Sequence, residues 1–554
     1  MGNKKVLLIS PKNPLGGGSI IPPLGLATNA SYIPDRYDVL IADENVKQAN
    51  YSGADLVAVT TNTITARRAY RLCEEFREKG VPIVLGGIHP SVMPDEASRY
   101  ADAIVAGNGE NVWGELLEDF ERGRLKKVYR PGPFDLTQSV VPRRDLLKGR
   151  YFVDSLQTSR GCPFDCEFCS VTRLYGGEYK YKPLDRIRRE LESLRTRNVL
   201  LVDDNILGVG KKAERRALSL FELLGEYGLH WIGQASINIA DNPEVLRLAQ
   251  ESGAKAFYIG FESLNEDFLR AANKRQNLRK GVGSYKDVIK RIHDHGIAVL
   301  ASFIYGTDFD TRDSLLRLAD FIYESTIDAT SVKPLTPFPG TRLYERLKQE
   351  GRLFDDNYWL EDPYPLFTFR PQKLSLQELA EATLGFLDVY NPLNSAGCFV
   401  RSCRLTKSVR ASFMAFLVNI SDNHTYRKYI RRHKHTLARR FGIDLHRKQK
   451  QYEQADPFFD EALNGRPREP GDDHPATLES QNHLAVLYKE QGDYDKAEPL
   501  LIEDVKSRRL KLGDTHPHTL ESWHNLIDLY EAWGKPEKAE EWRAKLLQTD
   551  NLSK

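Results

Sequence analysis

Two absences narrow the class of protein. The 554 residues include no run of 18 apolar residues, the length that a membrane-spanning helix needs. The apolar strand after Lys5 has only four residues, too few for the apolar region of a signal peptide. We therefore expect a cytoplasmic protein whose thiols stay reduced.

Low-complexity tracts are also absent, and the composition, 41% hydrophobic and 28% charged, is that of an ordinary globular protein. The length predicts three or four domains. The formal net charge is only +2, but acidic residues are scarce in one stretch. Residues 401–450 hold 14 Lys and Arg against two Asp and Glu, a local charge of +12 that leaves −10 for the rest of the chain.

Cysteine is scarce too, and its distribution is informative. Three of the six cysteines, Cys162, Cys166 and Cys169, lie within eight residues. Three thiolates can hold a four-iron cluster and leave one iron open to a ligand that is not protein. A structural zinc site is the alternative, but zinc sites usually close with four ligands, and no fourth Cys or His lies near this loop. The spacing therefore predicts an iron–sulfur cluster.

This triplet, with the aromatic Phe168 just before the third cysteine, resembles the signature of the radical S-adenosylmethionine (SAM) enzymes. The resemblance implies a [4Fe-4S] cluster whose open iron binds the amino and carboxylate groups of SAM. It also implies that the reduced cluster splits SAM into methionine and a 5'-deoxyadenosyl radical. An electron donor such as a flavodoxin or a ferredoxin is then expected as a partner.

Residues 1–135 alternate short β-branched runs with helical patterns, which predicts a flavodoxin- or Rossmann-like parallel sheet. The expected strands are residues 6–10, 37–42, 55–60, 82–85 and 103–106, and the clearest helices are 65–79 and 112–121. Glycines and small polar residues follow the strands, at the edge where open α/β sheets bind ligands. A dinucleotide is disfavoured because the G-x-G-x-x-G spacing is missing.

The order of three motifs in this segment resembles the cobalamin-binding domain that precedes many radical SAM barrels. The motifs are residues 22–26, 85–90 and 107–110. The D-x-H-x-x-G pattern of cobalamin enzymes with a histidine on cobalt is absent, so His89 is interpreted as a turn or supporting residue and not as a ligand. The resemblance implies cobalamin contacts at Gly16, Gly17, Leu24, Gly25, Thr60, Thr61, Asn62, Gly86, Gly87, Ile88, Gly107, Gly109 and Glu110.

Residues 136–390 are predicted to form a partial (β/α)6 barrel. The strand that enters the Cys loop is followed by expected strands at residues 199–203, 231–238, 256–261, 299–305 and 329–335. Barrel active sites lie at the carboxyl ends of strands. From the family resemblance, the SAM contacts expected there are Phe168, Asp203, Asp204, Asn205, Gln234, Ser236, Glu262, Ser302, Gly306 and Pro337. Tyr305 is interpreted as a core residue, and the sequence identifies no catalytic acid or base.

Residues 391–450 are predicted to be a basic helical region. An apolar run at residues 411–420 precedes several arginine pairs. A helical cap on the barrel is favoured because ten apolar residues suit a core helix. Contact with an anionic membrane surface stays open as the alternative. Nucleic acid is not favoured, since no RNA-binding motif with interleaved aromatics accompanies the charge.

Residues 451–554 contain an internal repeat. Residues 452–457 recur at 494–499, and residues 471–475 recur at 513–517, both with an offset of 42. Each unit reads as a helix pair and resembles a tetratricopeptide repeat of the longer, kinesin-light-chain-like variety. About two and a half units are present, and they are expected to bind a peptide or a protein partner or to pack on the barrel.

The whole chain therefore resembles a cobalamin-dependent radical SAM enzyme with a repeat tail. The family implication is methyl transfer from SAM, through methylcobalamin, to an unactivated carbon of a small-molecule or lipid-like substrate. The subgroup that includes hopanoid methylases is the most similar in its motifs. Two alternatives remain: a radical SAM cyclase or oxidoreductase that uses cobalamin without methylation, and a non-catalytic repeat scaffold.

Overall fold

The computed structural model describes residues 3–16, 21–46, 53–149, 151–389, 392–419, 485, 488–489, 492–513 and 517–551. The chain divides into two compact units, residues 1–437 and 438–554. Of the predicted segments, residues 451–484 and the arginine pairs beyond residue 420 lie outside the described residues. No helix within the described ranges is both long and apolar enough to cross a membrane.

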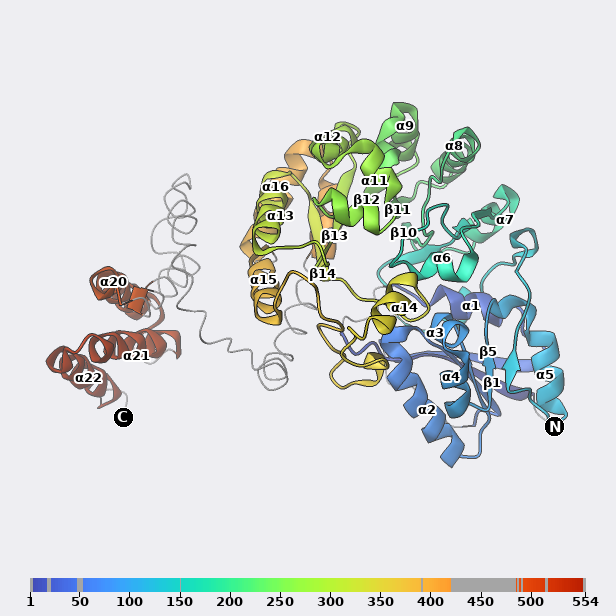
Figure 1. Ribbon diagram of the computed structural model, residues 1–554, viewed down its shortest axis with the longest axis horizontal. Coiled ribbons are helices and arrows are strands. Elements are labelled where there is room, and N and C mark those ends of the chain that lie inside the picture. The colour runs from blue at the N-terminus through green and yellow to red at the C-terminus, as the bar shows by residue number, and fades with distance from the viewer. Residues whose placement is uncertain are drawn as a thin grey trace. The chain divides into compact units, whose positions relative to one another are not determined.

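The first sheet of unit 1 has six parallel strands in the order β2-β1-β3-β4-β5-β6 (Figure 1). This is a flavodoxin-like order, in which the direction of chain progression reverses beside β1. The strands are β1 Lys4–Ser10, β2 Tyr37–Asp43, β3 Leu56–Thr60, β4 Ile83–Gly86, β5 Ala103–Val105 and β6 Val128–Tyr129. The predicted sheet is confirmed, and β6 is an additional edge strand of two residues that was not predicted.

Helices cover both faces of this sheet. They are α1 Leu24–Ala30, α2 Ala66–Glu78, α3 Ile88–Val92, α4 Pro94–Tyr100 and α5 Trp113–Glu121. Helix α2 buries Ala69, Leu72 and Phe76 at helical spacing. A reciprocal pair of hydrogen bonds between Asn62 and Thr65 precedes it and fixes the turn that follows β3.

The second sheet is an open, six-stranded partial barrel in the order β14-β13-β12-β11-β10-β7, with every neighbouring pair parallel. Its strands are β7 Asp154–Leu156, β10 Asn198–Leu201, β11 His230–Ala235, β12 Ala254–Glu262, β13 Ala298–Tyr305 and β14 Ala329–Pro334. The predicted partial barrel is confirmed. The short strands β8 Ser159–Arg160 and β9 Lys180–Tyr181 pair antiparallel beside it.

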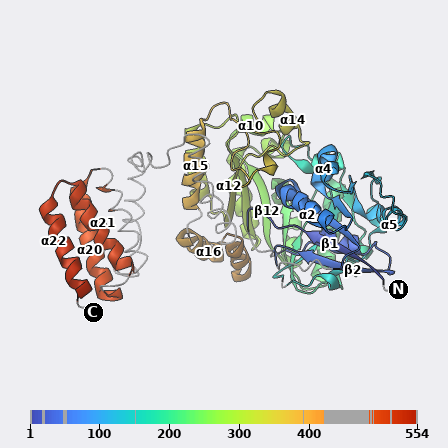
Figure 2. The same ribbon diagram turned by 90° about the horizontal axis from the view of Figure 1, so that it is seen from below.

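A ring of helices surrounds the partial barrel (Figures 1 and 2). These helices are α6 Ser170–Tyr175, α7 Leu184–Leu191, α8 Lys211–Gly225, α9 Pro243–Glu251, α10 Glu266–Ala271, α11 Arg275–Lys280, α12 Tyr285–Asp294, α13 Arg312–Glu324, α14 Arg342–Gln349, α15 Leu376–Val389 and α16 Pro392–Thr406. The strands bury Trp231, Phe257 and Phe303 fully, whereas Gly260 and Ser302, paired in register, are half-buried. Tyr305 is buried and bonds Thr383 of α15 at 2.7 Å, as expected of a core tyrosine.

The end of the barrel opposite the Cys loop is filled by a helix at residues 409–419. Ala411 and Ala415 of this helix pack against Ala256, Ala298 and Ala329, which lie at or near the starts of their strands. Small residues on both sides let the backbones approach closely. The apolar run at residues 411–420 therefore forms the predicted helical cap over the residues that the structure describes.

A connection after the barrel returns to the first sheet. Trp359 and Tyr358, in a short helical turn at Tyr358–Leu360, join Tyr344 of α14 in one core cluster with Tyr70 and Phe76 of α2. The two sheets of unit 1 are thus linked by shared core packing.

Unit 2 contains the described helices α20 Tyr494–Leu512, α21 Pro517–Ala532 and α22 Pro536–Asn551. They share a core that includes Trp523, Leu526 and Leu529. Buried Asp504 pairs with Arg508 at 2.8 Å and accepts a hydrogen bond from Ser522 at 2.5 Å. Over residues 494–551, this packing of consecutive helices confirms the predicted all-helical fold.

Candidate active site

The Cys loop, residues 161–169, lies at the carboxyl end of the partial barrel and is held by two carboxylates that follow β10. Asp203 is fully buried and accepts hydrogen bonds from Thr158 N at 2.8 Å and Ser159 Oγ at 2.9 Å. Burial raises the pKa of Asp203 to about 6, against the opposing effect of these hydrogen bonds. Asp204 accepts a bond from Gly161 N at 3.0 Å. Both carboxylates therefore fix the entry to the loop.

Gly161 shows why this entry needs glycine. Its φ is +86°, and a Cβ there would lie 2.0 Å from the carbonyl oxygen of Glu178. Any other residue would be strained in backbone and would clash with a rigid partner. Gly161 thus forms the tight turn that immediately precedes Cys162.

The far side of the loop is hydrogen-bonded to two barrel elements, the end of α10 and the start of α14. Ala272 O accepts a hydrogen bond from Glu167 N at 3.0 Å, and Glu167 O accepts one from Leu343 N at 3.3 Å. Asn273, which follows α10 with a φ of +57°, donates to Asp165 O at 2.7 Å. The backbone on both sides of Cys166 is therefore fixed.

The three thiols are the ligand type that an iron–sulfur cluster takes, and Lys274 lies near all three. Burial raises the pKa of Cys162 and Cys169, and raises that of Cys166 to about 12, while Lys274 acts to lower all three. Within the described residues, no group of three or more His, Cys, Asp or Glu side chains is arranged to hold a single metal ion. A four-iron cluster has another requirement, because each thiolate binds a different iron. The ligand assignment of the three cysteines stays a prediction.

Lys274 and Glu262 form a buried ion pair at the end of β12. Their side chains approach to 2.5 Å and are 10% and 9% exposed. Burial acts to lower the pKa of Lys274, but Glu262 and the thiols of Cys166 and Cys169 outweigh it and raise that pKa. Glu262 has a φ of +64°, an uncommon conformation for a non-glycine residue. Gly260 makes room, since a Cβ there would lie 2.2 Å from Glu262 Oε1.

The predicted SAM residues differ in their burial and in their hydrogen bonds within the protein. Asp203 and Asn205 are buried and bonded within the protein, Asn205 to Ser236 Oγ at 2.8 Å. Gln234 is exposed, whereas Asp204, Ser302 and Phe168 are half-buried. Gly306, whose φ is +77°, and Pro337 are buried. Their contacts with SAM stay predictions.

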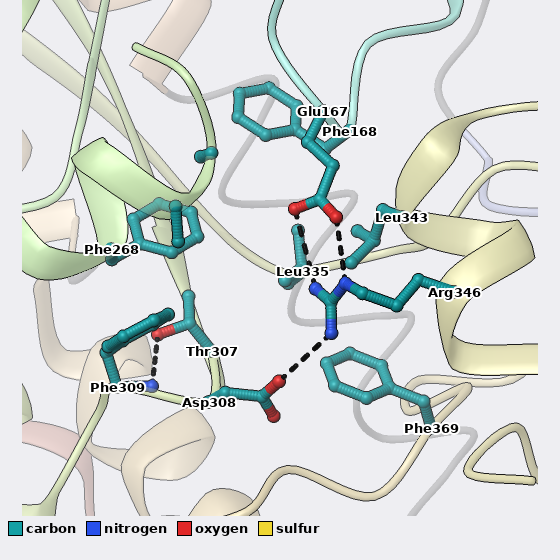
Figure 3. A pocket seen from close by; sticks show the side chains of 12 residues that line it. Glu167, Phe168, Phe268, Thr307, Asp308, Phe309, Leu335, Leu343, Arg346 and Phe369 are labelled. Atoms are coloured by element: carbon teal, nitrogen blue, oxygen red, sulfur yellow. Dashed lines mark hydrogen bonds and ion pairs between the residues drawn. The ribbon is translucent and has the colours of Figure 1, made fainter. Parts of the chain in front are cut away.

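A pocket of about 340 Å³, part of it open to solvent, adjoins these residues (Figure 3). Its wall is largely apolar and is contributed by the Cys loop, by α10 and α14, and by the segments that follow β13 and β14. The lining includes Phe168, Phe268, Thr307, Phe309, Leu335, Leu343 and Phe369. Phe168 therefore lines the same pocket as Thr307, which follows Gly306, and as Leu335, which lies two positions before Pro337.

One side of the pocket carries charge. Figure 3 shows Arg346 of α14 reaching both Glu167 of the Cys loop and Asp308, which follows β13. The Arg346 guanidinium lies 2.9 Å from Glu167 Oε1 and 3.6 Å from Asp308 Oδ2. One turn earlier, Arg342 pairs with Asp165 at 2.7 Å. Two arginines of α14 therefore form ion pairs with acidic residues of the Cys loop.

The predicted cobalamin residues cluster at the carboxyl edge of the first sheet. Thr60 ends β3 and is followed by Thr61 and Asn62, and Gly86 ends the neighbouring strand β4 and is followed by Gly87 and Ile88. Gly87 has a φ of +103°, and a Cβ there would lie 2.7 Å from Thr61 O. The Thr61 hydroxyl is buried and has no hydrogen-bond partner among the described residues. An unsatisfied donor in a glycine cradle fits a polar ligand.

The other predicted cobalamin residues have varied environments. Gly25 and Gly107 are exposed, and Leu24 and Gly16 are half-buried, while Gly17 lies outside the described residues. Gly109 is packed so closely that a Cβ would lie 2.3 Å from Asn29 Oδ1. These assignments stay predictions.

Glu110, also in that predicted group, joins the two sheets. It is buried and pairs with Arg160 at 2.7 Å, and Arg160 also donates to Asn108 Oδ1 at 3.1 Å. Arg160 stands two residues before Cys162. The carboxyl edges of the two parallel sheets therefore meet beside the Cys loop.

His89 is fully buried in a polar network. Its Nε2 lies 3.1 Å from Tyr70 Oη and 3.2 Å from Glu96 Oε1, and its Nδ1 lies 3.4 Å from Thr63 Oγ1. Glu96 also accepts from Trp359 Nε1 at 3.0 Å. Both ring nitrogens have protein partners, which agrees with a supporting role for His89.

Three charged residues near the Cys loop were not predicted: Lys274, Arg346 and Arg160. Each depends on a contact distant in sequence, so no local pattern marks it. Only Arg160 had a signal in the local sequence, because it stands just before Gly161, the glycine that opens the Cys loop.

Three family models match this chain. Residues 156–322 match the Radical SAM superfamily, residues 17–117 the B12 binding domain, and residues 436–503 the tetratricopeptide repeat.

Curated relatives match more than half of this chain. The chain is 32% identical over 400 residues to bacteriochlorophyllide d C-12(1)-methyltransferase of Chlorobaculum tepidum, covering 68% of this chain and 85% of the relative. It is 30% identical over 353 residues to hopanoid C-2 methylase of Rhodopseudomonas palustris, with 61% and 66% covered. An anaerobic magnesium-protoporphyrin IX monomethyl ester cyclase of Rubrivivax gelatinosus is 24% identical over 402 residues, with 63% and 71% covered.

A solved structure has the same fold. The radical SAM methyltransferase TsrM of Kitasatospora setae, solved with cobalamin and a [4Fe-4S] cluster bound, superposes with a TM-score of 0.54 at 18% identity. The match covers 63% of this chain and 78% of TsrM. At that identity the likeness shows the fold alone.

Proposed function

Because this chain belongs to the radical SAM superfamily, among the members that carry a B12-binding domain, we propose that it methylates an unactivated carbon of a polycyclic or lipid-like small molecule. The enzyme's cofactors are a [4Fe-4S] cluster, SAM and cobalamin. When bound, they supply the electron that cleaves SAM and the carrier of the methyl group. The two relatives named as methylases act on bacteriochlorophyllide d and a hopanoid, and their polycyclic nature supports the substrate class.

The chain's own residues prepare the site. Cys162, Cys166 and Cys169 hold the cluster and leave one iron position without a protein ligand. Asp203 keeps the loop entry rigid from its buried position, so Asp204, which is half-buried, is the carboxylate that we assign to the SAM ammonium. Glu262 orients the ribose hydroxyls while Lys274 neutralises its charge. The apolar wall at Phe168 excludes water beside the adenine.

The observation that carries the proposal is the Arg160–Glu110 pair. It joins the loop after β5 in the first sheet to the residue that precedes the Cys loop. Ligands of open α/β sheets bind at the carboxyl edge, and barrel chemistry takes place at the carboxyl ends of barrel strands. A corrinoid beside Thr61 and Gly87 and SAM at the Cys loop would therefore lie at neighbouring carboxyl edges of the two sheets.

Two partners complete the proposal. An electron donor such as a flavodoxin or a ferredoxin reduces the cluster, and a peptide or protein binds the tetratricopeptide repeats. The expected cytoplasmic location stays a prediction.

The test begins with anaerobic reconstitution of the full chain with iron, sulfide and hydroxocobalamin. Wild type should retain about four irons per chain and one corrinoid, and with SAM and a low-potential reductant it should form both 5'-deoxyadenosine and S-adenosylhomocysteine. The triple variant C162S/C166S/C169S should lose the iron and both products. The matched control C403S, which alters a half-buried cysteine outside the loop, should keep them.

Other outcomes discriminate between the alternatives. Iron and 5'-deoxyadenosine without bound corrinoid would overturn the cobalamin assignment of residues 1–135. Both cofactors with 5'-deoxyadenosine but no S-adenosylhomocysteine would favour the cyclase or oxidoreductase alternative, for which the 24%-identical cyclase is the supporting observation. Absence of iron in wild type would favour the repeat scaffold.

A further inference from the structure

The turn between α16 and the helix at residues 409–419 exposes apolar side chains beside basic ones. We call this surface the basal knuckle and define it as Arg404, Leu405, Lys407, Val409, Arg410 and Phe413. It lies at the end of the barrel opposite the Cys loop, because Ala411 and Ala415 of the same helix pack among residues near the strand starts. It therefore belongs to neither the cluster site nor the cobalamin edge.

The apolar part of the knuckle is exposed to an unusual degree. Leu405 is 37% exposed, Val409 67% and Phe413 46%. With Val400, they make four of the fifteen exposed large hydrophobic residues among those described, all four within 14 residues. Val409 and Phe413 are four apart and share a helix face, so they form a ridge.

The charge around this ridge is of one sign. Arg404, Lys407 and Arg410 are exposed, and in the described parts of the chain none of the three pairs with a carboxylate; Arg410 hydrogen-bonds to His230 Nε2 instead. Residues 392–419 contain four Lys and Arg and no Asp or Glu. The positive field extends to the strand starts: burial, then Lys255 and Arg410, lower the pKa of His230. An anionic surface would complement this charge.

We propose that the basal knuckle docks on an anionic membrane surface. Leu405, Val409 and Phe413 insert among the lipid headgroups, and the arginines and lysine meet the phosphates with their aliphatic stems lying along the apolar ridge. Lys255 adds to the same field from the start of β12. Docking at this end leaves the carboxyl edge of the barrel unobstructed.

Two other occupants fit less well. The chain's own next segment, residues 420–450, carries ten Lys and Arg against two Asp and Glu, so its charge repels the knuckle. An acidic protein would satisfy the cations, but exposed aliphatic and aromatic side chains flanked by cations are typical of interfacial membrane contact. The acidic protein is kept as an outcome of the test.

The test is flotation of the full chain with vesicles of phosphatidylcholine alone or with 30% phosphatidylglycerol, taken as a rough working fraction within the range of anionic membranes. Wild type should bind the anionic vesicles and release them in high salt. The variant R404E/K407E should bind roughly 25-fold or more weakly, at about fivefold per cation. The variant V409S/F413S should lose about tenfold from the apolar area withdrawn from the bilayer.

The matched control is L316S/Y323S, which removes two other exposed large side chains, 57% and 49% exposed on α13, and should bind as wild type does. Iron content and thermal melting should be unchanged in all variants, since the altered residues are exposed. Equal binding of wild type and both knuckle variants would overturn the proposal and assign binding to residues 420–450 or the repeats. Failure of wild type to bind anionic vesicles would overturn it in favour of an acidic protein partner.

Discussion

At the scale of single residues, Lys274 has the most demanding position. It is 8% exposed, it pairs with Glu262, and it lies near enough to Cys166 and Cys169 to act on their pKa values. A buried cation is stable only when its partner is retained, and removal of one partner leaves an uncompensated charge. Lys274 therefore couples the stability of the barrel mouth to the charge of the cluster site.

The substitution Lys274→Met should lower the free energy of unfolding of the cofactor-free protein by about 3–5 kcal/mol, because Glu262 would be buried without a partner. The double variant K274M/E262Q should recover most of that loss, since neither charge remains. Chemical denaturation of the two variants measures the difference. Equal loss in the single and double variants would show that packing, and not charge, explains the effect.

At the scale of elements, the sequence predicted those features that depend only on residues close together in the chain. The strand at residues 299–305 could be predicted because it is a short, nearly continuous apolar run, and the cluster could be predicted because its three cysteines lie within eight residues. The contacts of α14 could not be predicted in this way. Arg346 and Glu167 are 179 residues apart, and their pairing depends on the curvature that brings the end of β14 beside the Cys loop. The same limit applied to β6, a two-residue edge strand whose position is fixed by Val105 and not by its own pattern.

Helix α14 offers a matched pair of substitutions at adjacent turns. Arg346→Gln should weaken SAM binding and reduce the iron retained after desalting by severalfold, because it frees Glu167, only 17% exposed, from its partner. Arg342→Gln should have little effect, since the Arg342–Asp165 pair is about half exposed on both sides and such surface pairs contribute about 0–1 kcal/mol. Iron per chain and the Kd of SAM are the measurements. Similar losses in both variants would contradict a specific role for Arg346.

At the scale of the whole molecule, unit 1 brings two parallel sheets edge to edge. The contact at Arg160–Glu110 lies on the cysteine side, and the Trp359–Glu96–His89 network lies at a second point between the same two sheets. Two separated contacts fix the orientation of one sheet relative to the other, whereas a single contact would let the sheets rotate about it. The distance between a corrinoid on one edge and SAM on the other is therefore set by these buried polar contacts together with the shared apolar core.

Glu110→Gln tests that dependence. The amide keeps the size of the side chain but removes the charge that Arg160 meets, so the loop after β5 should loosen from the Cys loop. Corrinoid retained per chain and S-adenosylhomocysteine formed should fall at least about fivefold, the effect of roughly 1 kcal/mol or more expected for a charged hydrogen bond, while iron content should stay within the error of wild type. The control Glu115→Gln alters a carboxylate whose pairing with Lys126 is about half exposed on each side, and it should behave as wild type. If Glu110→Gln lost iron and corrinoid in parallel, the pair would be holding the Cys loop itself, and the two cofactor sites would have to be regarded as one folding unit.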